Sequence, residues 1–237
     1  MAEKTYEIRI TRQDPDTGEK TKSFYQIPVI PGMTVLEALW YIVDRIDGSL
    51  SFRYSCRGGV CGSCSMQINR EVQLACQVQL SMLPQGTIII EPLPRLSVIK
   101  DLVVDMKPFM NKYNSVQPFF ANKKLPQQGE MVQSAEQRTD IEDSVKCIMC
   151  GACYVVCPLV YKDADFMGPA AMAAAQRFAF DSRNEQGKQR LVEVNGLGDF
   201  HGCLKVGKCS HVCPKGVDPA RRIEEIREYV EALSKNN

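Results

Sequence analysis

Eleven cysteines gathered in three short stretches constrain this chain more than any other feature of its sequence. An odd number of cysteines cannot be fully paired as disulfides within one chain. The N-terminal sequence MAEKTYEIRI is charged and lacks the apolar core of a secretory signal, so we expect reduced thiols. Tight cysteine clusters in such a chain are typical of metal sites. The sequence therefore predicts a metalloprotein whose cysteine-rich loops form its functional centres.

Length and charge narrow the remaining classes of protein. The 237 residues, of which 44% are hydrophobic, suffice for one large domain or two modest ones with their own cores. The formal net charge is +1, with basic and acidic residues well mixed, which gives no electrostatic case for binding nucleic acid. No stretch approaches the roughly 20 apolar residues that span a bilayer. We therefore expect a cytosolic protein that reaches a membrane only through a partner.

The first hundred residues have the pattern of short strands around one helix. Residues 33–46 carry apolar side chains at helical spacing, with Thr34 as the predicted N-cap and Gly48 as the predicted end. The apolar positions are Val35, Leu36, Leu39, Ile42, Val43 and Ile46. Strands are predicted at residues 6–10, 23–29, 65–69, 72–78 and 87–93. This order predicts a small mixed sheet that clasps one helix.

Helical patterns replace strand patterns after about Arg95. Helices are expected at residues 101–120, with Pro108 and Pro118 as limits, at residues 169–180, and after Asp218 as N-cap, with a polar surface linker at residues 122–137. On the last helix, Ile223, Ile226, Val230 and Leu233 share one face. The chain is therefore predicted to be α+β, with one domain at residues 1–105 and an α-helical domain at residues 106–237.

The first cysteine cluster has the spacing C-x4-C-x2-C-x11-C. Its opening is the spacing of plant-type [2Fe-2S] ferredoxins, although their fourth cysteine lies much further along the chain. Gly58, Gly59 and Gly62 would let the backbone wrap a cluster and aim its N–H groups at sulfur. The predicted [2Fe-2S] ligands are Cys56, Cys61, Cys64 and Cys76. The alternative for these four thiolates is a structural zinc site.

The second and third clusters resemble the two halves of a bacterial ferredoxin. CIMCGACYVVCP, which starts at Cys147, is the complete run C-x2-C-x2-C-x3-C-P. The run that starts at Cys203 matches it except that Val206 replaces the second cysteine. Three cysteines of one run hold one cluster and the fourth ligates the other. The predicted ligands are Cys147, Cys150, Cys153 and Cys213 for a [4Fe-4S] cluster, and Cys157, Cys203 and Cys209 for its neighbour.

Val206 determines the type of the third cluster in this interpretation. A cubane corner without a thiolate loses its iron readily, so three ligands predict [3Fe-4S]. The alternative is a labile [4Fe-4S] cluster with water or hydroxide on the open corner, but the apolar Val206 would shield that corner. The eleven cysteines are then all used, as four, four and three.

The sequence offers no site for organic chemistry of its own. It contains no dinucleotide fingerprint, P-loop or candidate triad. His201 and His211 both stand beside cluster cysteines and are expected to be packed or hydrogen-bonding neighbours, not catalysts. Three clusters of different type predict a chain that carries electrons between partners, without catalytic residues of its own. A free-standing ferredoxin and a zinc-stabilised interaction module are the alternatives.

Several motifs together resemble one family along essentially the whole chain. They are SCRGGVCGSC, LACQ, KDLVVDM, CIMCGACYVVCP, GPAAM, RFAFDSR and CSHVCPKG. The chain resembles the iron–sulfur subunit of succinate dehydrogenase and fumarate reductase, respiratory complex II. The resemblance implies a β-grasp ferredoxin domain, then an α-helical ferredoxin domain. It also implies a flavoprotein partner with FAD and a membrane anchor of one or more cytochrome b subunits, often with haem b.

The resemblance further implies a path from FAD through [2Fe-2S], [4Fe-4S] and [3Fe-4S], one of each per chain, to menaquinone or ubiquinone. By position, Pro158 should line the quinone site. Lys162 and Leu204 stand where some members of the family have tryptophan and histidine. The other candidate polar groups are Lys205, Glu224 and Arg227. Such a subunit is expected on the cytoplasmic face of a bacterial inner membrane, held there by its partners.

Overall fold

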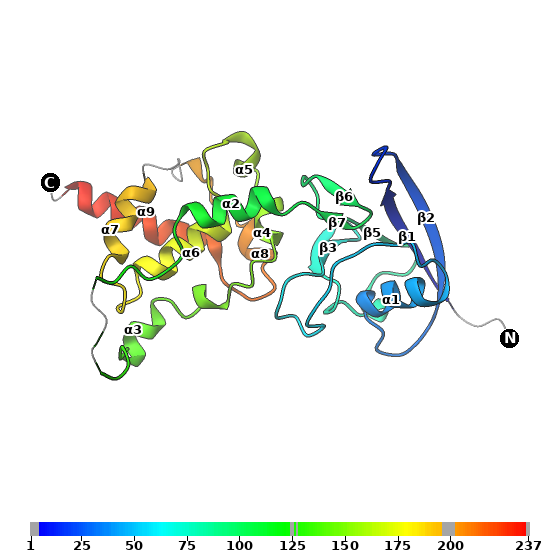
Figure 1. The fold of residues 1–237 in the computed structure, drawn as a ribbon, viewed down its shortest axis with the longest axis horizontal. Helices are drawn as coiled ribbons and strands as arrows, with labels where there is room; N and C mark the ends of the chain where they lie inside the picture. Colours follow the sequence, from blue (N-terminus) through cyan, green and yellow to red (C-terminus); the bar gives the residue numbers. More distant parts are fainter. Residues whose placement is uncertain (1–4, 124–125, 127, 196–201, 236–237) are drawn as a thin grey trace. The chain divides into compact units, whose positions relative to one another are not determined.

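The structure is a computed structural model that describes residues 5–123, 126, 128–195 and 202–235. The chain divides into two units (Figure 1). The first contains residues 1–106 together with residues 148–155, and the second contains residues 107–147 and 156–237. Residues 148–155, which carry part of one cysteine run, group with the first unit and not with the helical one. The predicted division into domains at residues 1–105 and 106–237 therefore stays a prediction.

The first unit is built on a mixed five-stranded sheet. Its strands are β1 (Thr5–Gln13), β2 (Lys20–Pro28), β3 (Ser65–Ile68), β4 (Glu71–Leu74) and β5 (Ile88–Glu91), in the order β2-β1-β5-β3-β4. Only β1 and β5 pair in parallel among these neighbours. A short hairpin of β6 (Val98–Lys100) and β7 (Val103–Val104) and a 3₁₀ turn, η1 (Leu80–Met82), complete the unit.

The predicted helix is present as α1 (Val35–Arg45) and packs its apolar side into the core formed by the sheet (Figure 1). Thr34 caps it in a capping box with Glu37, as the sequence predicted for Thr34. Four of the predicted apolar positions are buried: Val35, Leu36, Leu39 and Ile42. Ile46 is 49% exposed because the helix ends one residue earlier, so Gly48 is not its end.

Two expected elements differ in the structure. The strand expected at residues 72–78 ends at Leu74, since the Gln77 N–H turns back to donate to the Leu74 carbonyl. The helix expected at residues 101–120 is shorter, as α2 (Lys107–Ser115). The segment before it enters the hairpin β6–β7, so this part of the prediction was wrong.

Asp101 causes the second difference, because its carboxylate anchors the β6–β7 turn in the core of the unit. The residue is 2% exposed and accepts from Arg12 Nε at 2.7 Å, from the Ser51 N–H at 2.9 Å and from the Gln13 N–H at 3.3 Å. Arg12 also donates to Asp47 at 2.7 Å. A buried carboxylate with three donors is well satisfied, and this arrangement joins β1, the β6–β7 turn and the segment after α1.

We expect Asp101→Asn to destabilise the first unit by about 3 kcal/mol, because it leaves the Arg12 guanidinium without its buried counter-charge. Asn fits the same volume and tolerates the positive φ of this residue, so the effect should come from charge and not from shape. The measurement is the urea midpoint of unfolding followed by the fluorescence of Trp40, the one tryptophan of the chain, which lies on α1 of the first unit. Asp16→Asn, in the exposed β1–β2 turn, is the matched control, and equal midpoints for both variants would contradict the role of Asp101.

The second unit is helical. Its helices are α2, α3 (Ala135–Thr139), α5 (Leu159–Lys162), α6 (Pro169–Ala179), α7 (Gly187–Asn195), α8 (Lys208–His211) and α9 (Pro219–Lys235), with a 3₁₀ turn, η2 (Ser144–Lys146); α4 (Ala152–Val155) belongs to the first unit. The predicted helices at residues 169–180 and after Asp218 are confirmed. The expected linker at residues 122–137 is partly wrong, since α3 begins within it behind a Ser134 capping box.

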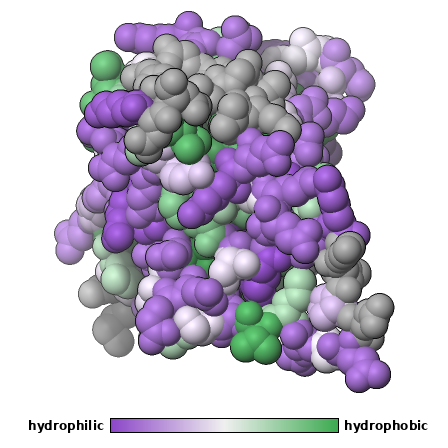
Figure 2. All heavy atoms as spheres, turned by 90° about the vertical axis from the view of Figure 1, so that its left-hand side faces the viewer, coloured by the Kyte–Doolittle hydropathy of each residue, from purple (hydrophilic) through white to green (hydrophobic). Residues whose placement is uncertain are grey.

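Helix α6 is the centre of the second unit. Its alanines are buried and let α2, α7 and α9 approach closely. Gln176, 1% exposed, accepts from the Ser144 hydroxyl at 2.6 Å and donates to Glu225 of α9 at 2.9 Å. The face that carries α7 and α9 is mainly hydrophilic (Figure 2), since α9 buries Ile223, Ile226 and Val230. No helix in the described part of the chain has the length and apolarity that a membrane crossing needs.

Candidate metal centres

The first cysteine loop curls its backbone around the sulfur of Cys56. The N–H groups of Gly58, Val60 and Cys61 lie 3.4, 3.2 and 3.2 Å from Cys56 Sγ. The Cys56 N–H in turn lies 3.4 Å from Cys61 Sγ, to which the Ser63 hydroxyl also donates at 3.3 Å. Donors aimed at sulfur stabilise thiolates and cluster sulfides, so the loop has the arrangement expected for an iron–sulfur site.

The hairpin β3–β4 explains the unusual spacing of the fourth cysteine. Asn69 and Arg70 both have positive φ, which makes the two-residue turn that suits the strand twist. The strands pair from Ile68 with Glu71 to Ser65 with Leu74, and the Ala75 N–H donates to the Cys64 carbonyl at 3.0 Å. Cys64 and Cys76 therefore flank the same end of one hairpin. The eleven residues between these two cysteines contain the hairpin, which returns the chain to the first cysteine loop.

The electrostatics of this loop fit a metal-bound thiolate site. Burial opposes ionisation of Cys61, but hydrogen bonds from Cys56 and Ser63 outweigh it and lower the pKa of that thiol to about 6. Burial, together with the nearby thiols of Cys76 and Cys61, raises the pKa of Cys64 to about 12. A buried thiol of this kind ionises when it coordinates a metal. The donor set of four cysteine sulfurs with few competing ligands suits a [2Fe-2S] cluster.

The four thiols of the first cysteine loop are not grouped closely enough to bind a single metal ion. Among the described residues, no three histidine, cysteine, aspartate or glutamate side chains are close enough to hold one metal ion. No disulfide joins any of the eleven cysteines, all of which lie in the described part of the chain.

A close backbone contact joins two cysteine loops within the first unit. Gly62 has a φ of +71°, and a Cβ placed on it would lie 2.8 Å from the Cβ of Cys150 and 2.9 Å from the Ile148 carbonyl oxygen. Only glycine tolerates both conditions. The loop of the predicted [2Fe-2S] site is thus in direct contact with residues of the complete ferredoxin run.

The predicted [4Fe-4S] ligands are divided between the two units. Cys150 and Cys153 belong to the first unit, and Cys147 and Cys213 to the second. In the second unit, the Val217 N–H donates to Cys213 Sγ at 3.4 Å. The assembly of these four thiols into one site stays a prediction.

The third set of cysteines meets at one cavity of the second unit. The cavity has a volume of about 120 Å³, and three predicted ligands, Cys157, Cys203 and Cys209, line it together with Val206. Burial, with Cys157 and Cys203 nearby, raises the pKa of Cys209 to about 11. Cys213 follows Cys209 by only four residues but is not among the described residues that line the cavity.

Residues proposed for quinone binding lie at the same cavity or just beside it. Pro158, Lys162 and Leu204 line it. Lys205 forms an ion pair with Glu224 at 2.8 Å, and Arg227 lies 3.3 Å from the same carboxylate. Arg227 also donates to the Cys203 carbonyl at 3.4 Å, which ties α9 to a predicted ligand. Leu204 and Val206 are 79% and 53% exposed, so apolar side chains stand beside the exposed Lys162 and Lys208 at the cavity.

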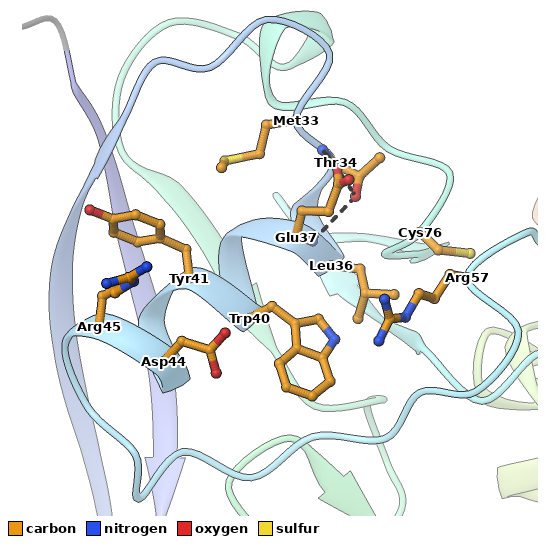
Figure 3. A pocket seen from close by; sticks show the side chains of 10 residues that line it. All are labelled: Met33, Thr34, Leu36, Glu37, Trp40, Tyr41, Asp44, Arg45, Arg57 and Cys76. Carbon is orange, nitrogen blue, oxygen red and sulfur yellow. Dashed lines mark hydrogen bonds between the residues drawn. The ribbon is translucent and has the colours of Figure 1, made fainter.

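A larger cavity of about 540 Å³ borders the first cysteine loop, and sequence reasoning did not find it. Helix α1 forms its wall, with Tyr41 and Arg45 at one end and Arg57 and Cys76 at the other (Figure 3). The Arg57 guanidinium lies 5.5 Å from the centre of the Trp40 ring, near enough for a cation–π contact. Cys76 therefore lies at the edge of this cavity, although the residue is only 6% exposed and belongs to the core.

The sequence did not predict that Gln77 would lie near the sulfur of Cys76. Gln77 donates from Nε2 towards Cys76 Sγ, and its position directly after a predicted ligand was the only available signal. His211 ends α8 and is exposed. His201 lies outside the described residues.

The mixed sheet with a cysteine loop, followed by a helical unit with ferredoxin-type runs, defines an iron–sulfur protein of the ferredoxin type. Two family descriptions match the chain: a 2Fe-2S iron-sulfur cluster binding domain at residues 7–111 and a 4Fe-4S dicluster domain at residues 143–217. Both support electron transfer, and the predicted α+β fold class is confirmed. The first match favours [2Fe-2S] over zinc for the first loop.

Relatives extend over nearly the whole chain. The fumarate reductase iron-sulfur subunit of Mycobacterium tuberculosis is 39% identical over 93% of this chain and 90% of its own length. The mitochondrial succinate dehydrogenase iron-sulfur subunit 1 of Oryza sativa is 37% identical over 94% and 82%. A chain of the Mycobacterium smegmatis Sdh1 complex in the apo form superposes with a TM-score of 0.86 at 26% identity, with 100% and 99% coverage. The chain belongs to the family of succinate dehydrogenase and fumarate reductase iron–sulfur subunits, which are parts of multi-subunit oxidoreductases.

Proposed function

We propose that this chain relays electrons between the FAD of a flavoprotein that interconverts succinate and fumarate and a membrane quinone, either menaquinone or ubiquinone. The observation that carries the proposal is the cavity at which Cys157, Cys203 and Cys209 meet beside Val206. Three thiols around one cavity, with an apolar residue in place of a fourth, suit a [3Fe-4S] cluster. A relay that ends in such a cluster beside exposed apolar side chains and a lysine is suited to pass electrons to a quinone, which has an apolar body and polar carbonyl oxygens.

The three clusters are assigned to the cysteines as follows. Cys56, Cys61, Cys64 and Cys76 hold [2Fe-2S]; Cys147, Cys150, Cys153 and Cys213 hold [4Fe-4S]; and Cys157, Cys203 and Cys209 hold [3Fe-4S]. When bound, the clusters supply one-electron transfer. The protein holds the thiolates, aims N–H groups at the sulfurs and limits access of water. FAD and any haem b belong to partner subunits, and this chain contributes no catalytic residue.

The contact of Gly62 with Cys150 supports the order of the relay. It brings a loop of the [2Fe-2S] site against a proposed ligand of the [4Fe-4S] site within the first unit. Cys157 continues the same run only seven residues beyond Cys150 and lines the third cavity. A single run of sequence thus connects all three proposed sites.

The quinone end is assigned to the mouth of the third cavity. Leu204 and Val206 give it apolar walls, and Lys162 supplies a cation that can donate to a quinone carbonyl oxygen. The ion pairs of Lys205, Glu224 and Arg227 fix the outer rim. We place this rim against a membrane anchor subunit, on the cytoplasmic face of a bacterial inner membrane.

The test uses the intact complex in two half-reactions. Succinate should reduce the clusters under anaerobic conditions, and a soluble quinone analogue should then reoxidise them, with the paramagnetic signal of oxidised [3Fe-4S] returning. If succinate did not reduce the clusters, the proposed function would be excluded.

Lys162→Met should raise the quinone concentration for half-maximal reoxidation about tenfold, the size expected for one lost hydrogen bond to a ligand. Reduction by succinate should stay unchanged, because Lys162 is proposed to act at the quinone end alone. Lys235→Met, at the end of α9, is the matched control. An unchanged quinone dependence for Lys162→Met would exclude Lys162 from the quinone site.

A further inference from the structure

The side chain of Gln77 lies against the sulfur of Cys76. Its Nε2 is 3.6 Å from Cys76 Sγ and 3.1 Å from the Cys76 carbonyl oxygen. A primary amide carries two N–H groups, so it donates to both acceptors at once. The bond from the Gln77 N–H to the Leu74 carbonyl, at 2.8 Å, fixes the backbone from which this side chain extends.

The amide is also held by the opposite segment of the loop. A Cβ placed on Gly59 would lie 2.8 Å from Gln77 Cδ and 3.1 Å from its Nε2, so the amide rests directly on the Gly59 backbone. Gly59 has a φ of +70° and is buried. Gln77 thus spans from the hairpin that carries Cys76 to the loop that carries Cys56 and Cys61, and packing keeps its amide beside the sulfur.

This donor differs in kind from those at the other end of the loop. Cys56 Sγ faces three backbone N–H groups, which a side-chain substitution other than proline leaves in place. The donor to Cys76 comes from a side chain, so a point mutation can delete it while the backbone stays in place. Cys76 itself is 6% exposed and lines one end of the cavity beside α1 (Figure 3).

Reduction adds one negative charge to an iron–sulfur cluster. A hydrogen bond to a ligand sulfur stabilises the more negative state, which raises the reduction potential. Packing of the Gln77 stem over Gly59 acts in addition, since it limits the approach of water to the loop. The two effects can be separated by a residue of similar shape that cannot donate.

We propose that Gln77 is a positioning residue for the [2Fe-2S] cluster, which acts through Cys76 and raises the reduction potential of that cluster. The inference rests on the proposed role of Cys76 as a ligand. Met is close to Gln in shape but has no N–H, and Glu adds a negative charge at the same place. Gln79→Met is the matched control, because it makes the same change two residues away on a side chain that is exposed like that of Gln77.

The test is an anaerobic redox titration of the intact complex, monitored by EPR of the reduced [2Fe-2S] cluster. Gln77→Met should lower the ratio of reduced to oxidised cluster at a fixed potential about tenfold, or about 59 mV for a one-electron couple. Gln77→Glu should lower it at least as far. Gln79→Met should match the wild-type protein, and the [3Fe-4S] midpoint in the same samples should not move.

The possible outcomes separate this inference from the function on which it rests. A wild-type midpoint in Gln77→Met with an assembled cluster would overturn it and leave Gln77 a packing role. Loss of the cluster in both Gln77 variants would also overturn it, since the residue would then serve assembly. Absence of any [2Fe-2S] signal in the wild-type complex would instead refute the assignment of Cys76.

Discussion

Val206→Cys should convert the third cluster from [3Fe-4S] to [4Fe-4S]. The variant supplies the thiolate that completes the run from Cys203, at a cavity which Cys157, Cys203 and Cys209 already line. A fourth thiolate retains the fourth iron and makes the cluster more negative, so its reduction potential should fall. We expect a fall of at least about 59 mV, which disfavours the electron on this cluster about tenfold.

The expected signs are spectroscopic and kinetic. The signal of the oxidised sample should disappear, the iron content should rise by about one per chain, and quinone reduction should slow about tenfold where electron arrival limits it. Val206→Ala is the matched control, because it removes the valine without adding a ligand. If Val206→Cys kept the original signal and full turnover, the residue would not determine the cluster type.

Cys213→Ser should remove the [4Fe-4S] cluster and leave [3Fe-4S] in place, although Cys213 follows Cys209 by only four residues. The structure supports the assignment, since Cys209 lines the third cavity and Cys213 is not among the described residues that do. Serine is a poor replacement because its harder oxygen matches iron–sulfur clusters less well than a thiolate does. The iron content should fall by about four per chain.

Cys157→Ser is the reciprocal variant, in the run that otherwise supplies the [4Fe-4S] ligands. It should abolish the signal of oxidised [3Fe-4S] and retain the reduced [4Fe-4S] signal. The two variants together test whether the fourth cysteine of each run crosses to the other cluster. The opposite pattern, with Cys213→Ser losing [3Fe-4S], would mean that each run holds its own cluster.

Local signals in the sequence were enough for the elements that depend on local chemistry. Thr34 with Glu37 three residues later is a complete capping box, and α1 begins there. Asp218 before Pro219 marked the start of α9, because the aspartate accepts from the Arg221 N–H and proline suits the first helical position. The cysteine spacing also predicted that Cys157, Cys203 and Cys209 share one cluster. All three line one cavity, and their ligation of a cluster stays a prediction.

Non-local contacts decided the parts that the sequence did not reveal. The pattern of residues 101–106 suited a helix, but Asp101 is held by Arg12 of β1, far away along the chain, and a hairpin forms instead. The strand expected through Cys76 ends at Leu74, where the chain turns and the Gln77 N–H donates to the Leu74 carbonyl. The amide of Gln77 gained its role from Gly59 across the loop, a contact that spacing alone does not encode.

The most direct test of the central claim is low-temperature EPR of the purified complex, first oxidised and then reduced. Oxidised [3Fe-4S] is paramagnetic, whereas oxidised [2Fe-2S] and [4Fe-4S] are silent. Eleven cysteines divided as four, four and three predict a signal in the oxidised sample, which a [2Fe-2S] signal replaces on reduction. Silence in the oxidised sample would contradict the three-thiolate site beside Val206 and, with it, the proposed end of the electron relay.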